Sequence, residues 1–141
     1  MFKKIFKTDK KQDSEYKNIM IAALLIHAAK MDENYTDIER GIISRALSDF
    51  THLPKNKIDE IIKLAEEKEK NSNQIIEYTK EIKKNSMDFR LQIIELLWNI
   101  IYSDGIADQY ETNLIRRICG LLYISNKDNG NIKLKIQKRL T

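Results

Sequence analysis

The sequence predicts an all-α fold, a single-domain helical bundle of about six or seven helices. Its 141 residues include only 4 Gly and 1 Pro, while Leu, Ile, Lys and Glu, which favour helices, are abundant. In addition, one unit occurs twice along the chain: a buried helix, an acidic corner and an amphipathic helix. The predicted architecture is therefore a bundle with an internal pseudo-two-fold repeat around two buried central helices.

Apolar periodicity places the individual helices. Two of them, at about 14–31 and 87–103, are apolar on nearly every side and should be buried all round. Amphipathic helices are expected at about 37–50, from Pro54 onward, at 73–83 and at 108–122, and Ser86 suits the N-cap of the 87–103 helix. The pattern of residues 125–141 fits a helix or a strand.

The charge distribution divides the chain into a mildly acidic body and two basic ends. Residues 1–12 carry five Lys and one Asp, and residues 125–141 carry four Lys, one Arg and one Asp, so each end has a net charge of +4. We therefore expect a basic N-terminal tail (1–12), a helical domain (13–124) and a basic C-terminal segment (125–141) that packs on the domain or extends from it. The overall charge of +4 is weak support for nucleic-acid binding.

The repeat is found by shifting the chain against itself by 72 residues, which aligns 21–47 with 93–119. Most of the identical positions are aliphatic, as in any two buried helices. The others are polar and are not explained by composition: Asp32 with Asp104, Glu39 with Glu111, and Arg45 with Arg117. On this alignment the helices from Pro54 to residue 83 connect the two copies.

Three of the acidic residues have a structural explanation. Thr36 and Glu39 have the T-x-x-E spacing of a capping box, and Asp108 and Glu111 have its D-x-x-E form. In such a box the first side chain accepts a hydrogen bond from the third helical amide, and the glutamate accepts one from the N-cap amide. These residues are therefore expected first of all to begin helices.

Asp32 and Asp104 lie at the C-terminal end of their helices, where the helix dipole disfavours a carboxylate. Three interactions could offset this cost: a salt bridge to Arg45 or Arg117, hydrogen bonds to the amides of the corner, or a bound cation. The candidate metal ligands are Asp32, Glu39, Asp104, Asp108 and Glu111, with the two arginines as orienting partners. Oxygen ligands of this kind suit Ca²⁺ or Mg²⁺, although neither corner has the ligand spacing of an EF-hand loop.

Both corners resemble a known family. The stretch ELLWNIIYSDGIADQYETNLIRRICGLLYIS, and to a lesser degree AAKMDENYTDIERGII, is similar to the TerB-like domains associated with tellurite resistance. The resemblance covers about residues 16–127. It implies an all-helical, non-catalytic cytoplasmic domain of metal or stress response, with divalent cations bound through Asp32, Glu39, Asp104 and Glu111. The first corner departs from the family pattern, because Glu33 stands where the second corner has Gly105.

Other chemistry is weakly represented. No Ser or Cys stands in a recognisable nucleophile motif and there is no Gly-rich phosphate loop, so we expect no enzyme. His27 and the single cysteine, Cys119, fall within apolar runs and are expected to pack in the core. The longest apolar run, 19–29, is too short to cross a bilayer, which needs about 20 residues. No signal peptide is evident, and we expect a cytoplasmic protein.

The predicted function is thus a non-enzymatic interaction module with protein partners and a divalent cation at its acidic corners. A rival hypothesis is peripheral binding to the inner face of the membrane, or to nucleic acid, through the basic ends. Lys3, Lys4 and Lys7 surround Phe2, Ile5 and Phe6 in a short cationic, amphipathic segment. Each lysine near an anionic surface contributes about 1 kcal/mol. Nucleic acid is the less expected of these partners.

Overall fold

The helices follow the predicted order along the chain. The structure is a computed structural model that describes residues 2–32, 35–71, 74–104 and 107–139, with side chains from Ser14 onward except those of Asp32 and Asp104. Over these ranges every regular element is a helix, which confirms the all-α prediction. The elements are α1 (Phe2–Ala29), η1 (Lys30–Asp32), α2 (Asp37–Thr51), α3 (Lys55–Asn71), α4 (Ile75–Lys83), α5 (Met87–Ile101), η2 (Tyr102–Asp104), α6 (Gln109–Leu121) and α7 (Asn126–Arg139).

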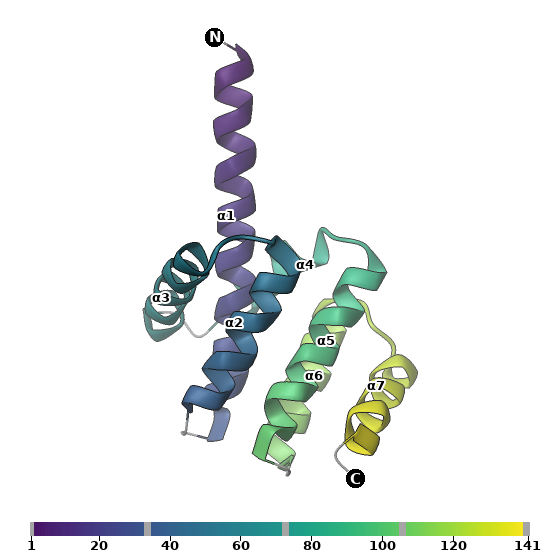
Figure 1. Ribbon diagram of the computed structural model, residues 1–141. Coiled ribbons are helices and arrows are strands. Elements are labelled where there is room, and N and C mark those ends of the chain that lie inside the picture. The colour runs from purple at the N-terminus through teal and green to yellow at the C-terminus, as the bar shows by residue number, and fades with distance from the viewer. Residues whose placement is uncertain (1, 33–34, 72–73, 105–106, 140–141) are drawn as a thin grey trace.

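The helices pack around α1 and α5. Helix α3 covers one side of α1 and α7 covers one side of α5, while α2 and α5 lie next to each other on the near face (Figure 1). The C-terminal half of α1 passes through the bundle, and its N-terminal half extends well beyond the other helices (Figure 1). Within the described part of the chain, no helix is both long enough and apolar enough to cross a membrane.

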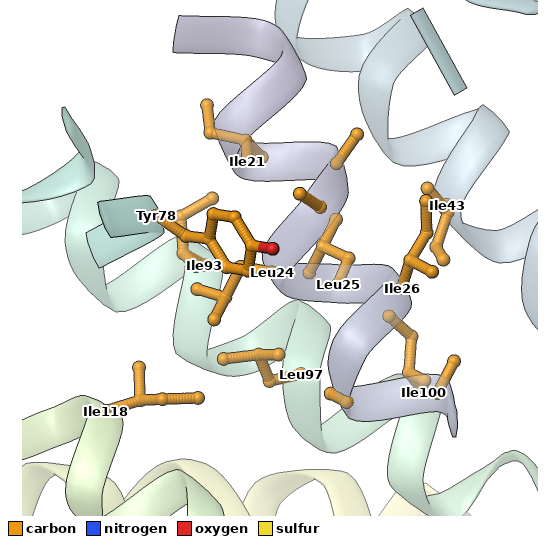
Figure 2. Close-up of a cluster of buried hydrophobic side chains, with 14 of the residues drawn as sticks. Ile21, Leu24, Leu25, Ile26, Ile43, Tyr78, Ile93, Leu97, Ile100 and Ile118 are labelled. Carbon is orange, nitrogen blue, oxygen red and sulfur yellow. The ribbon is translucent and has the colours of Figure 1, made fainter. Parts of the chain in front are cut away.

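The core forms where α1 and α5 meet, as the sequence predicts. Residues 20–26 of α1 are all at most 1% exposed, and Trp98 of α5 is fully buried. Figure 2 shows Leu24 and Leu25 of α1 facing Ile93 and Leu97 of α5, with Tyr78 of α4 beside them. Each large side chain buried in this way stabilises the fold by about 1.5–3 kcal/mol. The two central helices therefore supply much of the driving force for folding.

The internal repeat is present in the structure at its 72-residue spacing. Helix η1 ends at Asp32 and η2 at Asp104, and the N-caps that follow are Thr36 and Asp108. The corresponding residues after α2 and α6 are His52 and Tyr123, which both have a φ of 57°. They are 71 positions apart, so the spacing of the repeat falls by one residue after α6. At a spacing of 71, the first residue of α3, Lys55, corresponds to the first residue of α7, Asn126. Each copy is therefore a three-helix unit, α1–α2–α3 or α5–α6–α7.

This result corrects the prediction that both helices between Pro54 and residue 83 connect the copies. Helix α3 belongs to the first copy because α7 is its counterpart, and only α4 is a true connection. The 72-residue alignment misses α7 because the one-residue shift moves its apolar positions out of register. Residues 125–141 form a helix over Asn126–Arg139, which resolves their ambiguous pattern.

A second correction concerns the N-terminal tail. Residues 2–12 continue α1 without a break, so the helix begins at Phe2 and not near Ser14. The physical reason is that this stretch contains no Gly or Pro and is rich in Lys, which has good helix propensity. A smaller difference is that α3 starts at Lys55, with the carbonyl of Pro54 accepting hydrogen bonds from the amides of Lys57 and Ile58.

Candidate cation-binding corners

The first acidic corner joins α1 to α2 through η1. The hydroxyl oxygen of Thr36 accepts a hydrogen bond from the amide of Glu39 at 3.1 Å. In return, Oε1 of Glu39 accepts hydrogen bonds from the amide and the hydroxyl of Thr36, both at 3.0 Å. This is the predicted capping box, and it satisfies two amides that the first turn of the helix leaves without an intrahelical partner.

The second corner, between η2 and α6, repeats this arrangement with a carboxylate at the N-cap. Oδ1 of Asp108 accepts a hydrogen bond from the amide of Glu111 at 2.8 Å, and Oε1 of Glu111 accepts one from the amide of Asp108 at 3.2 Å. Asp108 itself is exposed. The structural role predicted for the cap residues is thus present at both corners.

The two capping glutamates are more buried than a surface cap requires. Glu39 is 6% exposed and Glu111 is 5% exposed, although most glutamates in proteins face water. A buried carboxylate needs compensating polar or charged groups. The N-cap amides and the positive ends of α2 and α6 provide part of this compensation. Each corner therefore positions a buried carboxylate seven residues after the aspartate that ends the preceding helix.

The other predicted site residues lie at the expected positions in their helices, but the structure does not describe all of their side chains. Asp32 and Asp104 are the last residues of η1 and η2, and their side chains lie outside the described part of the molecule. The side chains of Lys3, Lys4 and Lys7, on the projecting half of α1, also lie outside it. Arg45 and Arg117 are exposed, and within the described residues neither has an ion-pair partner. Their orienting role stays a prediction.

A polar cluster at the first corner was not predicted from the sequence. Arg40 of α2 pairs with Glu66 of α3 at 3.5 Å, and Tyr35 lies beside both residues. Burial, together with the negative charge of Glu66, raises the pKa of the Tyr35 phenol well above its ordinary value. Glu66 is 26 or more positions from Arg40 and Tyr35, so no local motif could have indicated its contact with them.

A second unpredicted cluster forms around Glu69, near the C-terminal end of α3. Its carboxylate accepts hydrogen bonds from Nζ of Lys30 at 2.8 Å and contacts Nδ1 of His27 at 3.2 Å. Glu69 is 8% exposed, and both of its partners lie at the end of the α1–η1 segment. The cluster therefore fastens α3 to the first copy's central helix, and it gives His27 a structural role in place of purely apolar packing.

The donor set at the corners indicates which ions would suit them. Their acidic side chains offer only oxygen, the ligand atom that Ca²⁺ and Mg²⁺ prefer, and neither corner contains the His or Cys typical of a zinc site. Across the described residues, no three His, Cys, Asp or Glu side chains are grouped closely enough to hold a metal. Any such site would therefore include a side chain outside the described ones, such as that of Asp32 or Asp104. Cys119 is buried, and burial raises its thiol pKa to about 12, so the thiol is not poised for catalysis or metal binding.

The comparison with protein families now identifies the fold. The family model described as "Tellurite resistance protein TerB" matches residues 18–134, from the middle of α1 to within α7. The chain belongs to the TerB family. No curated protein and no solved structure matches it significantly. The matched region contains both corners of this TerB-family protein, helices α5 and α6, and most of α7. The repeat therefore belongs to the TerB domain, and the projecting start of α1 precedes the match.

Proposed function

We propose that this TerB-family protein is a non-catalytic interaction module of metal or stress response whose acidic corners bind a divalent cation. The observation that carries this proposal is the duplicated corner. Two segments 72 residues apart have the same short helix ending in aspartate and the same buried capping glutamate. A helix N-terminus needs a cap, but it needs neither a nearly buried carboxylate nor a carboxylate at the preceding C-terminus.

Capping and cation binding are chemically compatible at one glutamate. A carboxylate has two oxygens and about four acceptor positions, and the capping box uses Oε1 of Glu39 and of Glu111. Asp32 and Asp104 would hold the ion directly, with Glu39 and Glu111 as further ligands. A hard cation would also neutralise the charge that each aspartate adds to the negative end of its helix. With Asp108, the second corner has three candidate ligands, whereas the first has two.

A thermal-shift titration with Ca²⁺, Mg²⁺, Mn²⁺ and Zn²⁺ tests this proposal. With free ion at 100 times its dissociation constant, the fold should gain about 2.7 kcal/mol, which is a shift of several degrees in Tm. Ca²⁺ or Mg²⁺ should be the effective ion because the ligands are oxygens. Asp104→Asn should weaken the response more than Asp32→Asn, because the second corner has three candidate ligands and the first has two.

Asp88→Asn is the matched control, since Asp88 is an exposed aspartate in the first turn of α5, away from both corners. This variant should respond to the ion as the wild type does. The cation proposal fails if no ion shifts Tm, or if Asp104→Asn and Asp32→Asn respond as strongly as the control.

The projection of α1 favours a second candidate function, peripheral binding to an anionic membrane. The segment that carries Lys3, Lys4 and Lys7 is helical and extends away from the bundle, so a flat surface could approach it without contacting the other helices (Figure 1). A chain lacking residues 1–12 should then lose binding to vesicles that contain phosphatidylserine. Unchanged co-sedimentation of the shortened chain would exclude this function, and binding by a single short segment should be weak and salt-sensitive.

A further inference from the structure

A groove runs along the face formed by α2, α5 and α7. It has a volume of about 700 Å³, and its floor contains the half-buried Ile42 and Leu96 together with Ile136. Ile38, which is 70% exposed, stands at its edge. Apolar side chains are therefore accessible to solvent along a surface bordered by three helices, which is the form of a site that receives a further helix.

The internal repeat shows what occupies the equivalent surface in the other half of the molecule. Helix α4 packs against α1 and α6, whose counterparts in the repeat are α5 and α2. The groove between α5 and α2 is thus the counterpart of the surface that α4 covers. The buried residues of α4 at this position are Ile75, Tyr78, Thr79 and Ile82, and Figure 2 shows Tyr78 beside Leu24.

Equivalent residues in the two halves differ in exposure, as expected if no helix covers the second half's counterpart of the α4 position. Leu24 of α1 is fully buried, whereas its counterpart Leu96 is half-buried. Leu114 of α6 is 4% exposed, whereas its counterpart Ile42 is half-buried. Helix α2 also packs directly on α5, so the groove is shallower than the position that α4 fills. A helix bound there would lie over Ile42 and Leu96 without separating α2 from α5.

The repeat also indicates the charge of the occupant. In the first half, Lys68 of α3 pairs with Glu77 of α4 at 2.6 Å. With the 71-residue spacing, the counterpart of Lys68 is Arg139, which lines the groove, is 54% exposed and pairs with Glu95 of α5 at 3.3 Å. Arg45 lines the opposite side. The groove is thus lined by two arginines and one carboxylate, that of Asp49. An acidic residue of the occupant would face Arg139 as Glu77 faces Lys68.

We infer that this groove binds one amphipathic, acidic helix of a partner protein, in the position that corresponds to α4. The bound segment would span about nine residues, the length of α4, with apolar residues at i, i+3 or i+4, and i+7 toward Leu96 and an acidic residue toward Arg139. This inference rests on the proposal that the protein is an interaction module, and it names the surface at which a partner docks. It is independent of whether the corners bind a cation.

A fluorescent peptide provides the test. The probe is a helix-stabilised peptide of residues 74–84 in which Lys80, Lys83 and Lys84 are replaced by Glu, and a second peptide keeps the lysines. Fluorescence anisotropy with the full chain should give a dissociation constant in the micromolar range for the acidic peptide, as is common for a small, shallow interface. The lysine peptide should bind at least about tenfold more weakly.

Variants of the protein locate the binding surface. Arg139→Glu should weaken binding of the acidic peptide by about fivefold or more, and Leu96→Glu should abolish it. Arg116→Glu is the matched control, because Arg116 is an exposed arginine on α6 outside the groove, and it should bind as the wild type does. Circular dichroism checks that each variant is folded, and Arg139→Glu keeps the test valid if Leu96→Glu does not fold.

Three results would overturn the inference: no binding of the acidic peptide at about 1 mM protein, equal binding of both peptides, or equal loss in Arg116→Glu and Arg139→Glu. A fourth is a dimer of the free protein that Leu96→Glu dissociates in sedimentation velocity, since a second copy would then cover the groove. Cation-induced thermal shifts measured on the same variants separate the two proposals. If the wild type does not bind the acidic peptide but keeps its cation response, the groove alone is contradicted, and peptide binding without a cation response contradicts the cation site alone.

Discussion

Removing the carboxylate of Glu69 should measurably loosen the attachment of α3 to α1. Glu69 is 8% exposed, and it contacts Nζ of Lys30 at 2.8 Å and Nδ1 of His27 at 3.2 Å. In Glu69→Ala both partners lose their acceptor, and the last turns of α3 lose their polar link to the end of α1. The change is confined to one side chain, because Ala is well tolerated in a helix.

The expected cost follows from the exposure of the partners. A hydrogen bond to a charged group contributes about 1.5–3 kcal/mol when it is buried. Lys30 is 37% exposed, so water replaces part of the lost interaction, whereas His27 is only 16% exposed. We therefore expect Glu69→Ala to lower the free energy of unfolding by about 2 kcal/mol. For a domain of this size that corresponds to a fall in Tm of about 6–8 °C.

Urea unfolding followed by circular dichroism measures this change. The midpoint should fall while the m-value stays constant, since the surface exposed on unfolding is nearly unchanged. Glu67→Ala is the control: Glu67 is an exposed glutamate on the same helix, and its removal should change stability by less than about 0.5 kcal/mol. If Glu69→Ala costs no more than Glu67→Ala, the cluster does not hold α3 in place and the reasoning is wrong.

Three further predictions concern other contacts. Thr36→Ala removes the N-cap acceptor of α2 and should cost about 1 kcal/mol in thermal unfolding, and an unchanged Tm would contradict the cap. Asn129→Ala deprives the buried Trp98 indole of its acceptor at 2.9 Å and should cost about 1–3 kcal/mol in urea, more than Asn126→Ala at the exposed start of α7. With its thiol pKa raised to about 12, Cys119 should resist a thiol reagent at pH 8 until the protein is unfolded, and rapid labelling of the native state would contradict its burial. Because this pKa is higher in the fold than its ordinary value of 9.0, the thiol's contribution to stability is complete below pH 9 and is lost as the pH rises toward 12.

The local features of the fold could be predicted from the sequence because they depend on neighbouring residues. Apolar periodicity indicated the helices, and the spacing of Thr36 to Glu39 and of Asp108 to Glu111 indicated both capping boxes. Ser86 is the N-cap of α5 as expected, with its hydroxyl accepting a hydrogen bond from the amide of Phe89 at 3.2 Å. Each of these interactions spans three or four residues along the chain.

The continuation of the repeat into α7 could not be recognised in this way. The sequences of α3 and α7 show little similarity. In addition, the spacing of the repeat changes from 72 to 71 residues by the positions of His52 and Tyr123, so α7 falls out of the 72-residue alignment. What relates the two helices is their position against α1 and α5 in the packed molecule. The tail was misjudged for the opposite reason, since high charge does not prevent a Lys-rich segment from continuing an existing helix.

The sequence by itself thus determined the fold class, the helices that begin at capping boxes, and the duplicated acidic corner that belongs to the TerB family. Only the tertiary structure decided which residues meet across the chain, such as Glu69 with His27 and Lys30, and Glu66 with Arg40. It also decided that Ile42 and Leu96 line one groove. The physical reason is that capping and periodicity are local and leave a pattern at fixed spacing. Contacts between distant helices depend on how those helices pack.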